Sequence, residues 1–296
     1  GDASVTGTLT GNASAITLGS LTINSGGTYS ATSGTTTITS EAGTGNAMIS
    51  TGGGTFTHNS GTVTFNTTIG GGSDVRVDDT FNNVIKAGGT RISVRNTCTI
   101  AGDLTVQEGE WSQTSSNYAL TVTGDVSIED GGEIEGYAAA ISMGSLTIAS
   151  GGTYDATSGT TTITSEAGTG MAWNNLETDG TGFTHNNGLI KFTNNGTTVM
   201  QENTWYDVEM DADAATRAYE FRNLSSGGTI NILGNLTITE GEFELQAVSD
   251  DLVIHGLTNI TANGKFNNDA NQSSGSITHH GLVTNLGTYK TDPITT

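Results

Sequence analysis

The chain is poor in several residue types, and each scarcity limits its fold and function. Its 296 residues include one cysteine, which excludes a disulfide framework and a cysteine-rich metal site. Lysine and arginine number 9 against 30 aspartates and glutamates, a formal net charge of −21. Such a charge repels phosphate backbones and anionic lipid headgroups, so we expect no nucleic-acid partner. No run of about 18 apolar residues occurs, so we also expect no membrane insertion.

Proline is almost absent too, and the single one, Pro293, lies in the tail of the sequence. Proline cannot donate a hydrogen bond to a β-ladder, so its absence from the interior suits a chain of paired strands. Glycine, by contrast, occurs 43 times and supplies corners between strands. Apolar residues alternate with Thr, Ser or Asp, as in Leu104/Val106 and Val126/Ile128, which predicts β-strands.

A long internal duplication organises the sequence. Residues 19–45 return at 144–170 with only two differences. When small insertions are allowed, the match extends to two long copies at about 15–140 and 140–266, followed by a degenerate C-terminal coil at 267–296. We therefore expect one elongated domain of stacked units over residues 1–296.

A shorter period lies inside each copy. The pattern Gly-x-[Leu/Val]-x-[Ile/Val] is followed six to eight residues later by Gly-x-aromatic or Gly-x-Ile, and consecutive occurrences are 20 or 22 residues apart. It begins at Gly19, Gly102, Gly124, Gly144, Gly234 and Gly256, and in degenerate form at Gly281. This spacing predicts an all-β fold, a parallel β-solenoid in the form of a right-handed β-helix with coils of about 20–25 residues. The residues expected to point inward are Leu21, Ile23, Leu104, Val106, Val126, Ile128, Leu146, Ile148, Leu236 and Ile238.

Charged residues gather in two stretches. The first cluster comprises Asp74, Arg76, Asp78, Asp79, Lys86, Arg91 and Arg95. Because Val75/Val77 alternate with these charges, we expect the charged side chains to lie on a solvated strand face. The second stretch, residues 202–222, is the least repetitive and is predicted to be an outgrown loop.

Paired carboxylates are candidate catalytic groups, because solenoid enzymes place acids on neighbouring coils. The sequence offers Asp78/Asp79, Asp211/Asp213 and Asp250/Asp251. Adjacent residues in a strand point to opposite faces, and none of these pairs recurs between the copies. We therefore expect no catalytic residue and no enzymatic activity.

Metal and cofactor sites are likewise not expected. The Gly-Gly-x-Gly-x-Asp nonapeptide of calcium-binding β-rolls does not occur. Weak calcium binding at the surface stays open at Asp207/Glu209 or Asp211/Asp213, since residues i and i+2 of a strand share a face. His58 and His185, which recur in Phe-Thr-His-Asn, are expected to be structural rather than metal ligands.

The aromatic residues are candidates for carbohydrate stacking. The tryptophans Trp111, Trp173 and Trp205 align with apolar residues of the other copy, so we expect them in the core. Tyr206 aligns with Asn82 and is the better candidate for an exposed ring. Cys98 aligns with Ile230 and is expected to be a small buried apolar residue.

The repeated segments GSLTI…GGTY, GDLTV…GEW, GDVSI…GGEI and GNLTI…GEF resemble the Gly/Thr/Asn-rich β-solenoid repeats of bacterial surface adhesins and phage fibre-like structural proteins. The resemblance is one of repeat style and covers nearly the whole chain. It implies an extracellular, non-enzymatic structural or adhesive component of a fibre or virion. The alternative is a carbohydrate-binding or polysaccharide-degrading β-helix protein, and a cell-surface glycan is a candidate partner.

The two ends of the repeat array carry strand-like sequence without a capping helix. The terminal coils of a solenoid present unpaired backbone groups. We therefore expect end-to-end contacts, either with further coils of a longer chain or with another copy in a homo-oligomer.

Overall fold

A computed structural model describes residues 1–68, 72–177, 181–193, 198–200, 204–212, 214, 218–221, 228–245, 251–268 and 275–291. These residues form strands and turns but no helix, so none of them belongs to a helix that could cross a membrane. The chain divides into two compact units. The first comprises Gly1–Ile141 with Gly151–Asp155, and the second comprises Ser142–Ser150 with Ala156–Thr296.

The strands of the first unit are short, mostly three or four residues. They are β1 (Ala3–Val5), β2 (Thr8–Thr10), β3 (Ile16–Leu18), β4 (Leu21–Ile23), β5 (Thr28–Ser30), β6 (Thr35–Ile38), β7 (Asn46–Ser50), β8 (Thr55–Thr57), β9 (Thr62–Phe65), β10 (Ser73–Arg76), β11 (Asn83–Lys86), β12 (Ile92–Val94), β13 (Cys98–Ile100), β14 (Leu104–Val106), β15 (Gly109–Ser112), β16 (Leu120–Val122), β17 (Asp125–Ile128), β18 (Gly132–Glu135) and β21 (Thr153–Asp155). Strand β19 (Ile141–Met143) begins at the last residue of Gly1–Ile141 and continues into the second unit.

The second unit contains two longer strands, β31 and β33, among short ones. Its strands are β20 (Ser145–Ile148), β22 (Thr160–Ile163), β23 (Trp173–Asn175), β24 (Phe183–Thr184), β25 (Leu189–Phe192), β26 (Thr198–Met200), β27 (Thr204–Trp205), β28 (Asp207–Asp211), β29 (Ala218–Phe221), β30 (Thr229–Ile232), β31 (Leu236–Leu245), β32 (Asp251–Ile254), β33 (Thr258–Asn268), β34 (Ile277–His279), β35 (Val283–Asn285) and β36 (Thr288–Thr291).

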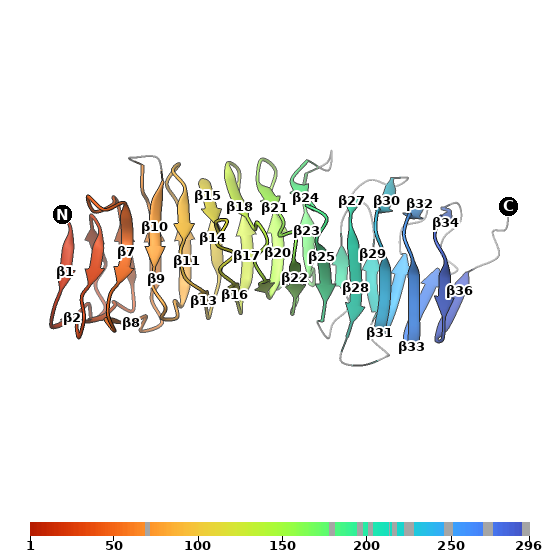
Figure 1. Ribbon diagram of the computed structural model, residues 1–296, viewed down its shortest axis with the longest axis horizontal. Coiled ribbons are helices and arrows are strands. Elements are labelled where there is room, and N and C mark those ends of the chain that lie inside the picture. The colour runs from red at the N-terminus through yellow and green to blue at the C-terminus, as the bar shows by residue number, and fades with distance from the viewer. Residues whose placement is uncertain are drawn as a thin grey trace. The chain divides into compact units, whose positions relative to one another are not determined.

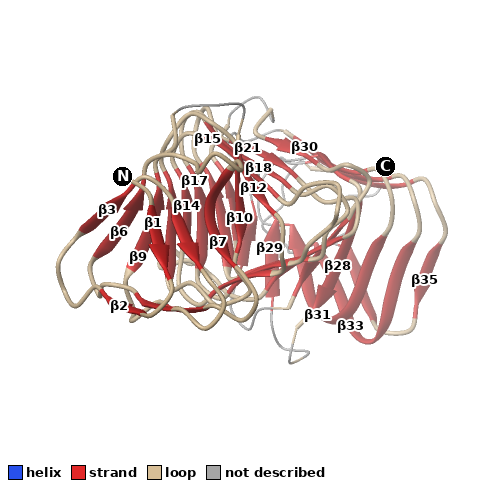
Figure 2. Ribbon diagram, turned by 60° about the vertical axis from the view of Figure 1, so that its left-hand side comes forward, coloured by secondary structure: helices blue, strands red, loops and turns tan. Residues whose placement is uncertain are grey.

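In the first unit each coil contributes strands to several parallel sheets. One sheet runs through β1, β4, β7, β10, β12, β15, β18 and β21, and a second contains β2, β5 and β8. A third ladder joins β3, β6, β9, β11, β14 and β17. Figure 2 shows β3, β6 and β9 side by side on one side of this unit, with β1, β7 and β10 on another. The parallel pairing confirms the predicted solenoid fold.

The second unit repeats this arrangement. Its ladders are β22–β25–β28–β31–β33, β20–β23–β26–β29–β31 and β27–β30–β32–β34, and β33 also pairs with β35 and β36. In Figure 1 the green to blue strands β28, β31 and β33 follow one another side by side. Coil length varies more widely than the sequence period predicts. Ala3 pairs with Leu21, which makes a shorter coil than predicted, whereas Thr160 pairs with Leu189, which makes a longer one.

The core of each unit consists of inward-pointing side chains that stack in columns. All ten residues predicted to point inward are buried, with 1 % exposure or less. Aromatic rings stack along one such column in the second unit: Phe221, Phe243, Phe266 and Tyr289 follow at centroid distances of 4.3, 5.1 and 4.9 Å. Burial of these apolar columns is the main favourable term that holds the coils together.

A ladder of hydrogen bonds from side chains to backbone amides joins successive coils along one corner of the solenoid. This corner ladder requires the glycine that opens each repeat. Asn83 Oδ1 accepts a hydrogen bond from the Asp103 amide, and Asp103 Oδ1 accepts one from the Asp125 amide, both at 2.9 Å. The Asn83 amide group thus lies directly against Gly102-Asp103, and the Asp103 carboxylate lies directly against Gly124-Asp125. A Cβ added at Gly124 would lie 2.2 Å from Asp103 Oδ1, so only glycine fits there.

The same corner ladder recurs in the second unit. Asp207 Oδ1 accepts from the Asn235 amide at 2.6 Å, and Asn235 Oδ1 accepts from the Leu257 amide at 2.8 Å. The side chain of Leu257 is apolar and cannot accept a hydrogen bond, so the ladder does not continue through it. This side chain is 54 % exposed. The pattern Gly-[Asp/Asn] is therefore a structural element that joins successive coils.

The stretch 202–222 differs from its sequence-based prediction. Its described part is not an outgrown loop, because Thr204–Trp205, Asp207–Asp211 and Ala218–Phe221 are strands of the ladders. The prediction was wrong because it relied on similarity between the copies. A coil needs only inward apolar residues, here Trp205, Val208 and Met210, and not a repeated sequence.

Replacing Gly124 with alanine should destabilise the protein by about 1–3 kcal/mol, because the new methyl group must displace the Asp103 carboxylate. Urea unfolding measures the change. Gly43→Ala is the matched control: nothing lies within 4 Å of a Cβ at this exposed position, so the change should stay within about 0.5 kcal/mol. Equal effects of the two substitutions would contradict the corner ladder.

Candidate functional site

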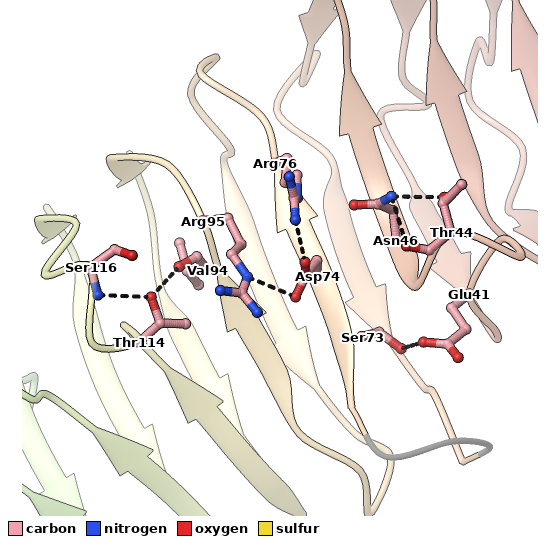
Figure 3. A network of polar contacts seen from close by, with 10 residues as sticks. All are labelled: Glu41, Thr44, Asn46, Ser73, Asp74, Arg76, Val94, Arg95, Thr114 and Ser116. Carbon is pink, nitrogen blue, oxygen red and sulfur yellow. Dashed lines mark hydrogen bonds and ion pairs between the residues drawn. The ribbon is translucent and has the colours of Figure 1, made fainter.

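Figure 3 shows polar contacts at and beside strands β7, β10 and β12, some of them buried, as at Ser73, and others exposed, as at Arg76. Asp74 accepts from Arg76 Nη2 at 2.7 Å and from Arg95 Nε at 3.0 Å, and the two guanidinium groups come from neighbouring strand positions. Both arginine side chains are well exposed, at 45 % and 39 %. Ion pairs this exposed contribute about 1 kcal/mol or less. These three residues therefore occupy the predicted solvated face, and Asp74 relieves the repulsion between the arginines.

Lys86 does not lie on that face, and the prediction that it is solvated was wrong. Its side chain is fully buried in an inward column, between Phe65 and Val106 of the adjoining strands. The ammonium group donates to the carbonyl of Gly88 and, at 2.8 Å, to that of Glu108. Burial lowers the pKa of Lys86 to about 8, although Glu108 and Glu110 act in the opposite direction.

Four carboxylates gather on the outward face of three successive strands, β15, β18 and β21. Glu110 pairs in register with Glu133, and Glu135 pairs with Asp155. We call Glu110, Glu133, Glu135 and Asp155 the acidic face. Like charges directly opposite each other on neighbouring strands repel. Ser112 offsets part of this repulsion by donating to Glu135 Oε2 at 3.2 Å.

The protonation of the acidic face reflects this crowding. Burial first, and then the hydrogen bond and charge of Glu135, raise the pKa of Glu110 to about 7, against the lowering effects of Ser112 and Arg91. Burial and then the charges of Asp155 and Glu135 raise the pKa of Glu133 as well. A carboxyl whose pKa is raised towards neutral pH has the chemistry of a general acid.

Sequence reasoning missed the acidic face because it considered only acids that are close in sequence. Glu110 and Glu133 are separated by a whole coil, yet both follow the second glycine of a repeat, in Gly109-Glu110-Trp111 and Gly132-Glu133-Ile134. Equivalent positions of consecutive repeats stack on neighbouring coils. That shared position was the signal that could have identified the site.

The acids that the sequence did single out are used to join coils. Asp79 Oδ2 accepts from the Phe56 amide at 2.7 Å, whereas Asp78 Oδ1 accepts from the Asn96 side chain at 2.6 Å. Asp251 Oδ1 accepts from the amide and hydroxyl of Ser276, both at 2.7 Å. Asp213 and Asp250 lie outside the described residues. None of the pairs is brought together as two free carboxylates within the described part of the chain.

The candidate calcium positions are engaged by protein groups. Lys191 lies 3.1 Å from Glu209 Oε1 and 2.6 Å from Asp211 Oδ2, while Asp207 holds the Asn235 amide. Among the residues that the structure describes, no three His, Cys, Asp or Glu side chains are placed to hold a metal ion. Weak calcium binding by these acids stays a prediction.

The three tryptophans are fully buried, as predicted from their alignment with apolar positions. Trp173 and Trp205 contact each other at a centroid distance of 4.9 Å. Tyr206 is only half-buried, and its ring stacks on His185 at 5.7 Å with an angle of 20°. Tyr206 and His185 therefore form a small aromatic surface on the second unit.

The two histidines of the Phe-Thr-His-Asn motif have the same structural role. His58 Nδ1 accepts from the Ser60 amide at 2.9 Å, and His185 Nδ1 accepts from the Asn187 amide at 3.0 Å. Asn59 and its equivalent Asn186 adopt φ angles of 48° and 46°, the left-handed conformation that asparagine tolerates in tight turns. The motif thus forms a turn, and both histidines have the structural role that was predicted for them.

Cys98 is buried in an inward column opposite Leu120, which confirms its predicted apolar role. Burial raises the pKa of the Cys98 thiol to about 12. A thiol that stays protonated and inaccessible is a poor nucleophile.

The acidic face predicts an unusual pH dependence of stability. Because folding raises the pKa of Glu110 from 4.5 to about 7, its contribution is fully present below pH 4.5 and is lost as pH rises towards 7. Glu110→Gln should therefore match the wild type near pH 4 and exceed its unfolding free energy near pH 8. The difference should be on the order of 1 kcal/mol after solvent screening. Urea unfolding across this range measures it, and a difference that does not vary with pH would contradict the assignment.

Lys86 predicts a pH dependence of opposite sign: its contribution to the unfolding free energy rises with pH in the alkaline range. Its pKa falls from 10.5 to about 8 on folding, so wild-type stability gains up to about 3 kcal/mol from this group as pH rises between these values. Lys86→Met, which copies Met210 at the corresponding column position of the second unit, removes the titrating group. The unfolding free energy of this variant minus that of the wild type should therefore shrink steadily from pH 8 to 10.5. A constant difference would show that Lys86 is not buried as a charge.

Comparison with known proteins adds no further constraint. No protein-family model matches this chain, and neither a curated protein nor a solved structure is similar to it. The parallel strands agree with the repeat style of β-solenoids, whereas the resemblance to adhesins and phage fibres stays a prediction.

Proposed function

We propose that this protein is a non-enzymatic structural component of an extracellular fibre or virion, in which its coils act as a stiff spacer or as a self-assembling, adhesive subunit. The observation that carries the proposal is that polar side chains of successive coils are bonded to one another. The corner ladder through Asn83, Asp103 and the Asp125 amide is the clearest example. Side chains engaged in this way contribute to cohesion between coils rather than to a reaction.

The surface charge supports the same proposal. A net charge of −21 keeps separate molecules apart sideways and favours solubility outside the cell. Added salt or divalent cations screen this repulsion, so bundling of the flanks would become possible at high ionic strength. A structural role needs both properties: cohesion between successive coils of one molecule, and electrostatic repulsion that limits lateral association of separate molecules.

A second candidate function is a carbohydrate-binding or polysaccharide-degrading protein. The acidic face favours it, because Glu110 and Glu135 come from neighbouring coils, and burial first and Glu135 next raise the pKa of Glu110 to about 7. The aromatic surface of Tyr206 and His185 offers a ring for stacking on a glycan. Both features are explained without a ligand, by repeat stacking and by turn geometry, so we rank this candidate second.

Turnover of a panel of neutral and acidic polysaccharides separates the two functions. We expect no cleavage, because the acidic face is a consequence of stacked repeats. Cleavage that is lost in both Glu110→Gln and Glu135→Gln, but retained in Asp78→Asn, would overturn the structural proposal in favour of the enzyme. Asp78 is the matched control, since its carboxylate bonds Asn96 on another part of the surface.

Stiffness can be measured directly by pulling single molecules from residues 1 and 296. A spacer should resist extension and then lengthen in discrete steps, because each coil is bonded to its neighbours. Gradual lengthening at low force would contradict the proposed role.

A further inference from the structure

One sheet of the first unit carries charges of both signs, and the two signs are separated along the stack of coils. Strands β10, β12, β15, β18 and β21 are consecutive neighbours in this sheet, and all belong to that unit. Arg76, Arg91 and Arg95 alternate with buried apolar residues on or beside β10 and β12, so they point outward. The acidic face lies on the other three strands. We call the outward surface of these five strands the dipolar surface.

The arginine end of the dipolar surface projects into solvent. Figure 3 shows Arg76 and Arg95 both bonded to Asp74, and their side chains are 45 % and 39 % exposed. Each of them donates one hydrogen bond to Asp74 and no other within the described part of the chain. Three guanidinium groups outnumber the two carboxylates at the outward positions here, Asp74 and Asp78. Because a guanidinium group has five N–H donors, this end can bind further carboxylates.

The acidic end is recessed by comparison. Its four carboxylates are half-buried, and like charges stand in register on neighbouring strands. Arg91 adjoins Glu110 through the pairing of β12 with β15, and its charge offsets part of the repulsion there. The described outward residues of β18 and β21 include no cation that could do the same. Projecting cations at one end and recessed anions at the other are therefore complementary in charge and in depth.

We propose that the dipolar surface binds the dipolar surface of a second copy of this chain, face to face and with the stacking direction of the coils reversed. The arginine end of each copy then covers the acidic end of the other. Such a two-fold contact is self-complementary, because the same patch serves on both copies, and it closes as a dimer. The inference rests on the proposed structural function and specifies one lateral contact for it.

A two-fold axis along β15 produces this arrangement. The rotation keeps the direction of the strands and reverses their order, so β12 lies over β18 of the other copy. Arg91 and Glu133 belong to the same outward column, because each of them adjoins Glu110 in register. Each Arg91 therefore faces Glu133 of the other copy, twice in the dimer. A guanidinium group can bind a carboxylate through two parallel hydrogen bonds, which fixes the orientation of the contact.

The carboxylates that meet across the contact have partners that offset their repulsion. Strand β10 lies over β21 of the other copy, so Asp74 faces Asp155. Arg76 and Arg95 already hold Asp74, and their remaining N–H groups can bind the second carboxylate as well. The two Glu110 carboxyls meet at the axis, where their raised pKa allows them to share a proton.

The net charge of −21 makes the contact selective. Most lateral contacts between two copies bring carboxylates together, and like charges across an interface weaken it. The reversed arrangement of the dipolar surface brings opposite charges together instead. Repulsion elsewhere and attraction here together define one orientation.

Charge reversal in two complementary variants tests the contact. Arg76→Glu with Arg91→Glu reverses the arginine end and leaves the ion pair of Arg95 with Asp74 in place. Glu133→Arg with Asp155→Arg reverses the acidic end. Either variant alone brings like charges together at both places in its own dimer. In a mixture, the two reversed ends face unlike charges, so a heterodimer regains attraction at both places.

Analytical ultracentrifugation of the full chain at constant ionic strength measures the outcome. The wild type should show a concentration-dependent equilibrium between monomer and dimer, and each variant alone should associate at least about tenfold more weakly. An equimolar mixture of the two variants should dimerise again. Thr55→Glu with Thr57→Glu is the control, because it adds negative charge to exposed positions of β8 in a different sheet and should dimerise like the wild type.

Thermal unfolding verifies that each variant folds. Arg76 and Arg91 are exposed, so the arginine variant tests the contact by itself if the other variant does not fold. A wild type that stays monomeric at high concentration would overturn the contact, as would dimers that persist unchanged in the arginine variant. A mixture of folded variants that stays monomeric would overturn it too. Polysaccharide cleavage, by contrast, would reject the structural function itself, so the two failures are distinguishable.

Discussion

The structure depends on close approach between the backbones of successive coils. Parallel strands of adjoining coils lie only about 4.8 Å apart, so the corners between strands must stack as closely as the strands do. At Gly124 this leaves room for the Asp103 carboxylate and for no side chain. The abundance of glycine, the scarcity of proline and the inward apolar columns all follow from this requirement. A chain under this constraint gains stability chiefly from neighbouring coils, as in other repeat proteins.

The same constraint determines what the polar residues do. Side chains on the surface of a coil stand beside the equivalent side chains of the next coil, so their nearest partners belong to the protein. Asp207 bonds the Asn235 amide, and Lys191 holds Glu209 and Asp211. Where partners of opposite charge are scarce, as on the acidic face, burial and neighbouring carboxyl groups raise the pKa of Glu110 and Glu133 instead. Because the contacts of these side chains within the protein are explained without a ligand, we propose a structural function and place the enzyme second.

Much of the fold could be predicted from the sequence, because period-two alternation and the duplication both report which side chains point inward. Leu104 and Ile238 were identified by alternation, and Trp111 by its alignment with Phe243. Lys86 was misplaced because its charge suggested solvent, while its column neighbours Phe65 and Val106 become known only with the register. The acidic face was missed for a related reason. The repeat pattern places Glu110 and Glu133 at the same position, but coil length varies, so the pairing of Glu135 with Asp155 becomes known only with the three-dimensional register.

Hydrogen exchange at the corners tests most directly whether side-chain bonds between coils hold this protein together. The account predicts that the amides of Asp103, Asp125 and Asn235, which donate to side chains of the preceding coil, exchange as slowly as the amides of the neighbouring strands. Protection at these positions would be expected only if the corners are bonded parts of the ladder. Exchange as fast as that of exposed turn amides would contradict the account, since the coils would then be joined by their strands alone.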